Sequence, residues 1–302
     1  MKKSLIALAA VAVSGAAMAQ SSVTLYGIAD VAVVKAKGVD ASLVDGGVSP
    51  SRWGLRGTED LGGGLAVNFN FEQHLDLTDG TASGFDRQAW VGLSSGFGAI
   101  KLGKTSTAYD DVAVSADPVF DAIRLSPAWM ARSIYAYNWN PASGVYYATP
   151  SFGGVSGAIS TTFKTGELND RINAAHVKYE GGPLFVAVAY QEEKNDLGDQ
   201  AKYTRVVGTY DFGVAKLLAA LGSTKDVEDD ITLGVDVPLG SSLLLSTGLT
   251  QIRPDVGNDG TSFGLGVAYS LSKRTTAYSA LRKDSKEIGD ARVIAGGLKH
   301  SF

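Results

Sequence analysis

Two groups of charged side chains in this chain could do chemistry. The first group is basic and consists of Arg52, Arg56 and Arg87. The second group lies within residues 106–143 and contains four aspartates followed by two arginines: Asp110, Asp111, Asp117, Asp121, Arg124 and Arg132. Guanidinium and carboxylate groups that face each other across an opening produce a transverse electric field, and such charged side chains are one way in which ions are discriminated. We therefore expect these residues to form a site that acts on ions.

Hydrolysis is the alternative chemistry, and it depends on histidine. The chain has three histidines, His74, His176 and His300, and no Gly-x-Ser-x-Gly nucleophile motif. His176 with Asp170 and a strand serine is the remaining arrangement, but a single histidine of this kind is more often a polar wall residue. No spacing typical of a zinc site occurs, and the acidic run 228–230 is a weak motif for calcium. We expect no catalytic residue, no cofactor and no bound metal.

The composition narrows the class of protein. A formal net charge of −4 gives no sign of nucleic-acid binding. The absence of cysteine excludes a disulfide framework and thiolate metal sites. The 37 glycines are too many for a helical protein, and after Ala19 no apolar run is long enough for a membrane helix.

The elements that must position the charged groups are β-strands. Apolar residues at every second position, such as Val67, Phe69 and Phe71 between Asn68 and Asn70, are typical of strands with one apolar face. Sixteen segments follow this pattern: 22–36, 51–58, 64–75, 85–94, 99–105, 144–150, 155–164, 171–180, 184–192, 201–211, 214–223, 230–237, 242–252, 261–270, 275–283 and 290–302.

The connections between these segments alternate between two kinds. One kind is short and rich in glycine, as in the turns at 96–98 and 181–183. The other kind is longer and polar, as at 37–50, 106–143 and 224–229. Short turns at one rim and longer loops at the other are typical of a transmembrane antiparallel β-barrel, and a closed barrel is the only alternative to helices for crossing a membrane. A soluble sandwich has no reason to segregate its turns in this way. A surface-binding barrel is disfavoured because most of the loops are short.

Strand alternation also predicts where the arginines point. Arg52 and Arg56 lie on the face opposite Trp53, and Arg87 lies opposite Trp90 if that aromatic ring faces lipid. An arginine facing lipid at the bilayer midplane costs about 2–4 kcal/mol, so we expect all three in the lumen. Residues 106–143 are too long for a hairpin and rich in aromatic residues, so we expect this third loop to pack inside the barrel and narrow it. Glycines in strands, such as Gly248 and Gly264, could mark barrel-to-barrel contacts or relieve crowding in the wall.

The N-terminus has the features of an export signal. Lys2 and Lys3 precede a short apolar stretch, and Ala17-Met18-Ala19 is a typical cleavage site. We expect residues 1–19 to be a signal peptide, cleaved after Ala19, and residues 20–302 to form the barrel.

Five segments, spread in order along the whole chain, resemble those of Gram-negative porins of the β-proteobacterial and neisserial type: 22–27, 51–65, 87–93, 146–154 and 297–302. The resemblance implies a homotrimer of 16-stranded barrels in the outer membrane, each a water-filled channel through which ions and small hydrophilic solutes diffuse. It implies contact with outer-membrane lipid and lipopolysaccharide. It also implies that the C-terminal Phe302 is a signal to the barrel-assembly machinery, although an ordinary interfacial aromatic is the alternative. A basic residue is common in this family where this chain has Tyr146.

Overall fold

The computed structural model describes residues 22–163, 171–195 and 198–302. The expected signal peptide and Asp170 lie outside these residues. The strands are β1 (Ser22–Ala36), β2 (Ser42–Asp45), β3 (Arg52–Gly62), β4 (Leu65–His74), β5 (Gln88–Ser95), β6 (Gly98–Lys104), β7 (Gly144–Ala148), β8 (Val155–Thr162), β9 (Arg171–Gly181), β10 (Leu184–Lys194), β11 (Gln200–Asp211), β12 (Lys216–Thr224), β13 (Glu228–Leu239), β14 (Leu243–Pro254), β15 (Gly260–Ser270), β16 (Thr275–Asp284) and β17 (Arg292–Ser301). The helices are the short elements α2 (Asp110–Ala113), η1 (Pro127–Met130), α3 (Arg132–Tyr135) and η2 (Lys286–Ile288). Among the residues described, no helix is long and apolar enough to cross a membrane.

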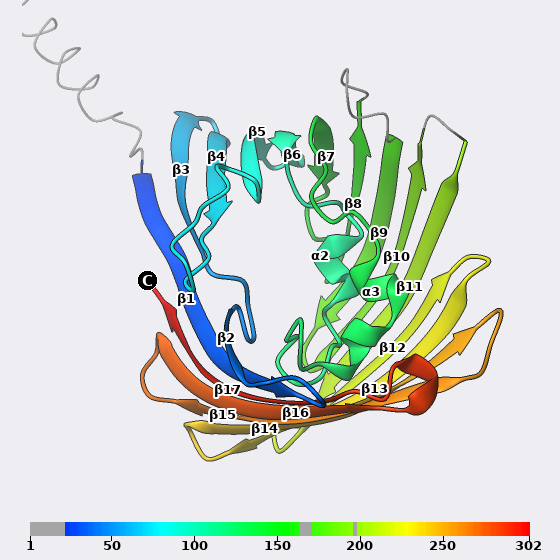
Figure 1. The fold of residues 1–302 in the computed structure, drawn as a ribbon. Helices are drawn as coiled ribbons and strands as arrows, with labels where there is room; N and C mark the ends of the chain where they lie inside the picture. Colours follow the sequence, from blue (N-terminus) through cyan, green and yellow to red (C-terminus); the bar gives the residue numbers. More distant parts are fainter. Residues whose placement is uncertain (1–21, 164–170, 196–197) are drawn as a thin grey trace, which may run out of the picture.

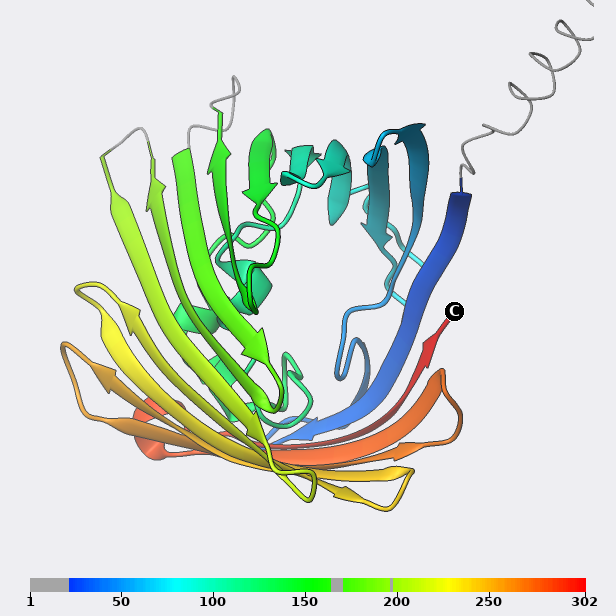
Figure 2. The same cartoon turned by 180° about the vertical axis from the view of Figure 1, so that it is seen from behind.

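The strands close into one antiparallel ring, as Figures 1 and 2 show from opposite sides. Closure occurs at β1, whose first half pairs with β3 and whose second half pairs with β17. β1 and β3–β17 form the ring, which confirms the predicted 16-stranded barrel. Closure of the described strands into a ring removes the free edges that an open sheet would have, which is the condition for a sheet to lie in hydrocarbon.

Two connections differ from the expectation. Within 37–50, the four residues of β2 pair with β1 beside the end of β3, so part of this loop belongs to the sheet. The connection expected at 224–229 is a tight turn of residues 225–227, because β13 already begins at Glu228. Polar residues on the two sides of this turn, such as Thr224 and Glu228, pair with each other and extend the β12–β13 ladder to the turn.

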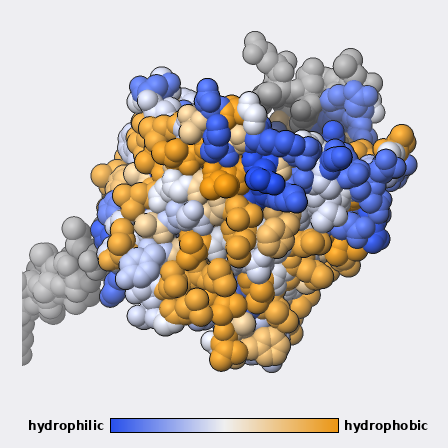
Figure 3. Space-filling view, turned by 60° about the horizontal axis from the view of Figure 1, so that its bottom comes forward, coloured by the Kyte–Doolittle hydropathy of each residue, from blue (hydrophilic) through white to orange (hydrophobic). Residues whose placement is uncertain are grey.

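The two faces of the wall differ in side-chain chemistry. On the outer face, large apolar side chains such as Ile159, Val177 and Leu233 are exposed, at 60%, 61% and 58%. On the inner face, polar side chains such as Arg205 and Thr232 are buried. Figure 3 shows hydrophobic side chains over much of the outside and hydrophilic ones gathered at its upper edge. An apolar surface of this extent on the outside fits a lipid environment and not water.

Residues 105–143, which connect β6 to β7, pack against the inner face. In Figures 1 and 2, α2 and α3 lie within the ring of strands. The Nδ1 atom of His176 on β9 lies 2.6 Å from the Ala108 carbonyl oxygen, and the Val119 amide donates to Ser246 on β14 at 2.7 Å. We call residues 105–143 the inner segment.

Candidate functional site

Four of the nine candidate residues line one cavity of about 390 Å³. Arg52 and Arg87 approach it from the wall, and Asp110 and Asp121 approach it from the inner segment. Basic and acidic groups therefore face the same opening from different elements. This is the arrangement expected of residues that produce a transverse field.

The two arginines are joined by a carboxylate that the sequence analysis did not single out. Glu72 on β4 lies 2.7 Å from Nε of Arg87 through one oxygen, and 3.8 Å from Nε of Arg52 through the other. The Tyr26 hydroxyl also donates to Glu72 at 2.8 Å. Trp139 of the inner segment packs over the Arg87 guanidinium, 5.0 Å from the ring centre. Glu72 thus fixes both arginines while neutralising about half of their charge.

The reason expected for the position of Arg87 is wrong. Trp90 does not face lipid, because it pairs with Asn70, which pairs with Arg56 on the inner face. The Lys101 ammonium lies 5.2 Å from the Trp90 ring, again on the inner face. Arg87 reaches the cavity because it precedes the first residue of β5, where strand alternation does not apply.

The two acids of the cavity are half-buried. Burial raises the pKa of Asp110 to about 6, although the hydrogen bond from the Tyr137 hydroxyl, 2.7 Å away, opposes the shift. Burial also raises the pKa of Asp121 well above its ordinary value. The negative charge on this side is therefore easily lost on acidification.

Asp111 and Asp117 do not line this cavity. Asp111 accepts a hydrogen bond from the Tyr146 hydroxyl on β7 and lies 3.8 Å from Nδ1 of His176. Asp117 lies 3.1 Å from Nη2 of Arg205 on β11. Both aspartates attach the inner segment to the wall.

Arg205 is the centre of a buried network that the sequence analysis missed. Its guanidinium contacts Asp117, lies 3.0 Å from Asp230 on β13, and donates to the Ala113 carbonyl at 2.8 Å. The Ser133 hydroxyl donates to Asp230. Strand alternation places Arg205 on the inner face, but its partners are remote in sequence, so no local motif marks them.

The glycines of β13, β14 and β15 form a seat for the inner segment. Gly234, Gly248 and Gly264 lie side by side across three strands. A Cβ atom on Gly248 would lie 2.3 Å from Pro118, and one on Gly264 would lie 2.6 Å from Pro127. We call these three residues the glycine seat. Neither explanation considered from the sequence accounts for them, because the absent side chains leave room for residues 118–127.

The chain next to the glycine seat has an unusual backbone. Val119, Phe120 and Asp121 have φ angles of 59°, 68° and 52°, in the left-handed region. A β-branched residue such as valine seldom adopts this conformation, which costs of order 1–3 kcal/mol. The close fit against the wall and the hydrogen bond to Ser246 hold this turn in place.

The remaining candidate arginines lie elsewhere. Arg56 packs over Tyr26, 5.0 Å from the ring centre, next to a different pocket. Arg124 and Arg132 have exposed side chains, and their backbones make the contacts: the Arg124 carbonyl accepts from Arg282 at 2.7 Å, and the Arg132 amide donates to Glu228 at 2.5 Å.

The weak calcium motif does not form one carboxylate cluster. Glu228 accepts from the Arg132 amide, and Asp230 pairs with Arg205, both on the inner face. Asp229 between them is exposed. Alternation along the strand thus separates the three carboxylates.

Comparison with known proteins identifies the family. The family model described as Gram-negative porin matches residues 5–288. This chain is a member of that family. Outer membrane porin protein 32 of Delftia acidovorans is 36% identical, over 99% of this chain and 95% of that protein. The anion-selective porin from Comamonas acidovorans is 25% identical, with a TM-score of 0.80 over 94% of this chain and all of that one. The OmpT outer membrane protein of Vibrio cholerae, in a trimer form, shares the fold, with a TM-score of 0.72 and 18% identity over 93% of this chain and 99% of that one.

Membership of this family confirms three expectations. The protein is an outer membrane porin, its fold is an antiparallel barrel, and its function is passive diffusion of solutes. The resemblance noted from the five sequence segments is confirmed with it.

Proposed function

We propose that this porin is a water-filled pore whose constriction is the cavity between Arg52, Arg87, Asp110 and Asp121, and that it favours anions. The observation that carries the proposal is the meeting of wall arginines and inner-segment carboxylates in one opening. The inner segment sets the size limit for solutes, and the charges set the preference for ions.

The anion preference rests on the wall arginines together with loss of charge from the opposing acids, because with every group ionised three carboxylates would outnumber the two arginines. Two arginines share one carboxylate, Glu72, so the wall carries an excess of positive charge. The opposing acids, Asp110 and Asp121, have raised pKa values and lose charge first as the pH falls. The similar porin from Comamonas acidovorans is described as anion-selective, which supports the same preference here.

We infer that the chain has no hydrolytic activity. His176, the histidine considered for catalysis, is buried, and its Nδ1 atom contacts the Ala108 carbonyl oxygen at 2.6 Å. Ser160 accepts a hydrogen bond from the Ala108 amide at 3.0 Å. Both side chains therefore anchor the inner segment, which accounts for them without catalysis.

We propose a homotrimer whose contacts involve the short strands. β5, β6, β7 and β8 have 8, 7, 5 and 8 residues, whereas a strand that spans a bilayer needs about 9–11. The outer face beside them carries an aromatic cluster in which Phe85 lies 6.3 Å from Trp53 and 5.6 Å from Phe71. Neighbouring barrels would cover this low part of the wall in place of lipid. The trimer form of the similar fold in OmpT supports this assembly.

Planar-bilayer recording of the refolded mature chain across a salt gradient tests these proposals. We expect stable ohmic steps that close in thirds at high voltage, and a reversal potential of the sign given by anions. Steps that close singly would contradict the trimer, and a reversal potential of the opposite sign would contradict the anion preference. Folded protein that does not conduct would show that the inner segment blocks the barrel.

A further inference from the structure

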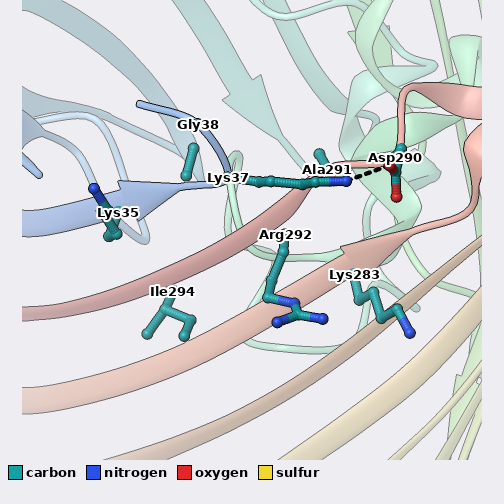
Figure 4. A pocket seen from close by; sticks show the side chains of 9 residues that line it. Lys35, Lys37, Gly38, Lys283, Asp290, Ala291, Arg292 and Ile294 are labelled. Carbon is teal, nitrogen blue, oxygen red and sulfur yellow. Dashed lines mark hydrogen bonds and ion pairs between the residues drawn. The ribbon is translucent and has the colours of Figure 1, made fainter. Parts of the chain in front are cut away.

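The connection between β1 and β3 enters the lumen. In Figures 1 and 2, β2 and the chain that leads from it to β3 lie on the inner side of β1. The connection is fixed at its start, where Lys37 forms an ion pair with Asp290 in the connection between β16 and β17 (Figure 4). It is fixed again at β2, which pairs with β1. Between Asp45 and Arg52 the chain leaves the wall, and we call residues 46–50 the first-loop segment.

Asp30 on β1 holds the first-loop segment through its carboxylate. The amides of Val48 and Ser49 donate to one carboxylate oxygen at 3.0 Å and 2.7 Å. The other oxygen accepts a hydrogen bond from the Tyr278 hydroxyl on β16. Asp30 is completely buried. A buried carboxylate that accepts three hydrogen bonds is held in one position, so the segment that donates to it is also fixed.

The backbone of Asp30 binds the chain at both ends of the first-loop segment. Its carbonyl accepts from the Gly46 amide at 2.8 Å, and its amide donates to the Ser51 hydroxyl at 2.9 Å. These bonds replace strand pairing on this side of Asp30, because β3 pairs with β1 only as far as Ile28 and β2 only from Val31. One residue of the wall therefore satisfies polar groups at the start, the middle and the end of the turn.

The first-loop segment lines the opening together with the inner segment. Val48, Ser49 and Pro50 line the cavity of the proposed constriction. Val48 also belongs to a buried cluster with Val119 and Ala122 of the inner segment. The two segments therefore share one apolar core, and each contributes a side of the opening.

Two apolar side chains mark the boundary between this cavity and an adjoining one. Pro50 of the first-loop segment and Ile123 of the inner segment line both the cavity of about 390 Å³ and a second cavity of about 340 Å³. His74 and Arg124 line the second cavity only. A solute that moves from one cavity to the other therefore passes beside Pro50 and Ile123.

We propose that the first-loop segment is a second constricting element of the pore, and that Asp30 is the positioning residue that holds it there. This inference rests on the proposed pore function. The inner segment narrows the lumen from one side, and the first-loop segment narrows it from the side of β1. The size limit for solutes thus depends on two segments from different connections, which meet at Pro50 and Ile123.

Cysteine modification tests where the first-loop segment lies, because the chain contains no cysteine of its own. Ser49→Cys keeps the backbone amide that binds Asp30. Attachment of a methanethiosulfonate reagent to this variant is expected to lower the single-channel conductance roughly twofold, because the added group occupies the cavity. The matched control is Ser42→Cys at the exposed start of β2, whose conductance should not change after the same treatment. Unchanged conductance of Ser49→Cys, with complete labelling shown by mass spectrometry, would overturn the proposal.

Liposome swelling tests the role of Asp30. Asp30→Ala removes the carboxylate, and Tyr278→Phe removes only the hydroxyl that donates to it. In both variants we expect the swelling rate with sucrose, relative to that with arabinose, to rise roughly twofold because the released segment leaves a wider opening. The ratio compares two sugars in one liposome preparation, so a loss of stability alone would not change it. Asp30→Asn keeps an oxygen that can accept the two amides and should restore the ratio.

The matched control for Tyr278→Phe is Tyr147→Phe, which removes a hydroxyl that donates to the Phe97 carbonyl at 2.7 Å, away from the opening. An unchanged ratio in both Asp30→Ala and Tyr278→Phe would overturn the proposal, and so would an equal rise in Tyr147→Phe. If Asp30→Ala does not refold, Tyr278→Phe decides. Unmodified protein that carries no current and admits neither sugar would contradict the pore function. Normal conductance with an unchanged ratio refutes only the second constriction.

Discussion

The guanidinium of Arg205 lies 3.1 Å from the carboxylate of Asp117, and both side chains are completely buried. Arg205 belongs to the wall and Asp117 to the inner segment, so this ion pair joins the two parts of the pore. Asp230 completes the network from β13, which is separated from the strand of Arg205 by β12. The position of the proposed constriction therefore depends on an ion pair that is buried away from solvent.

Arg205→Ala is expected to lower the free energy of unfolding by about 3–5 kcal/mol, because it leaves Asp117 and Asp230 buried without their cation. Urea unfolding of the refolded protein, followed by tryptophan fluorescence, measures this change. Arg253→Ala, at an exposed ion pair on the rim, is the control and should cost at most about 1 kcal/mol. Equal stability of the two variants would show that the network does not hold the inner segment.

Gly248→Ala is expected to displace the inner segment. The added Cβ would lie 2.3 Å from Pro118, and overpacking of this kind costs about 1–3 kcal/mol. The single-channel conductance should change along with the stability. Gly296→Ala, on the outer face with its nearest atom 3.7 Å away, is the control and should leave conductance unaltered. Unchanged conductance in Gly248→Ala would mean that the glycine seat does not position the constriction.

Arg52→Ala together with Arg87→Ala is expected to shift selectivity toward cations. Two charges about 6 Å from a permeating ion contribute about 0.7 kcal/mol each in water. Together they favour an anion and disfavour a cation by about 1.4 kcal/mol each, which corresponds to roughly 100-fold in the anion-to-cation permeability ratio. Glu72 also loses both cationic partners, which adds to the shift. The reversal potential measures it, and Arg56→Ala should have a smaller effect because Arg56 lies outside the cavity. An unchanged ion preference in the double variant would refute the proposed constriction.

The ion preference is expected to depend on pH through Asp110. Burial raises the pKa of Asp110 to about 6, so between pH 7 and pH 5 this carboxyl takes up a proton and the cavity loses a negative charge. Anion preference should therefore increase as the pH falls. Because the pKa is raised, the ionised carboxyl costs folding free energy above pH 6, and this cost fades at lower pH. In Asp110→Asn the change in reversal potential between these pH values should be smaller, and an undiminished change would assign it to other groups.

Phe302→Ala is expected to reduce assembly in cells more than stability in vitro. Phe302 joins the ends of the barrel through two backbone hydrogen bonds with Gly27, each of 3.1 Å, which alanine retains. Phe302 is 47% exposed and its ring lies over Gly27, so the substitution removes only part of the packing that a core aromatic residue would lose. Comparing the outer-membrane amount in cells with refolding yield in detergent measures the difference. Parallel losses in both would favour a purely structural role over the proposed assembly signal.

The sequence predicted the wall well because alternation is a local property. A strand such as β13 has a period of two whatever its neighbours are, so sixteen segments could be recognised without knowing how they pair. β2 was missed because only four residues, Ser42–Asp45, belong to it, too few for a visible pattern. Trp90 was placed on the wrong face because an aromatic side chain suits both a lipid interface and the ring contacts it makes with Lys101.

The site was predictable only in part. The residue types of the inner segment marked it as functional. The free-energy cost of an arginine that faces lipid predicted that Arg52 points into the lumen. The roles of individual aspartates depended on partners far away in the chain, such as Tyr146 for Asp111 and Arg205 for Asp117. Glu72 carried a usable signal, since it shares a strand face with Asn68 and Asn70, but its hold on two arginines required the pairing of β3 with β4.

The glycine seat also restricts the order in which the pore can be built. The inner segment connects β6 to β7, whereas its seat belongs to β13, β14 and β15, which come much later in the chain. A partly inserted barrel therefore lacks the strands against which the inner segment packs. The turn at Val119 then lacks the contacts that keep it in its left-handed conformation. The proposed constriction is completed only when β13, β14 and β15 have joined the wall, so the opening of an unfinished barrel would be wider than that of a finished one.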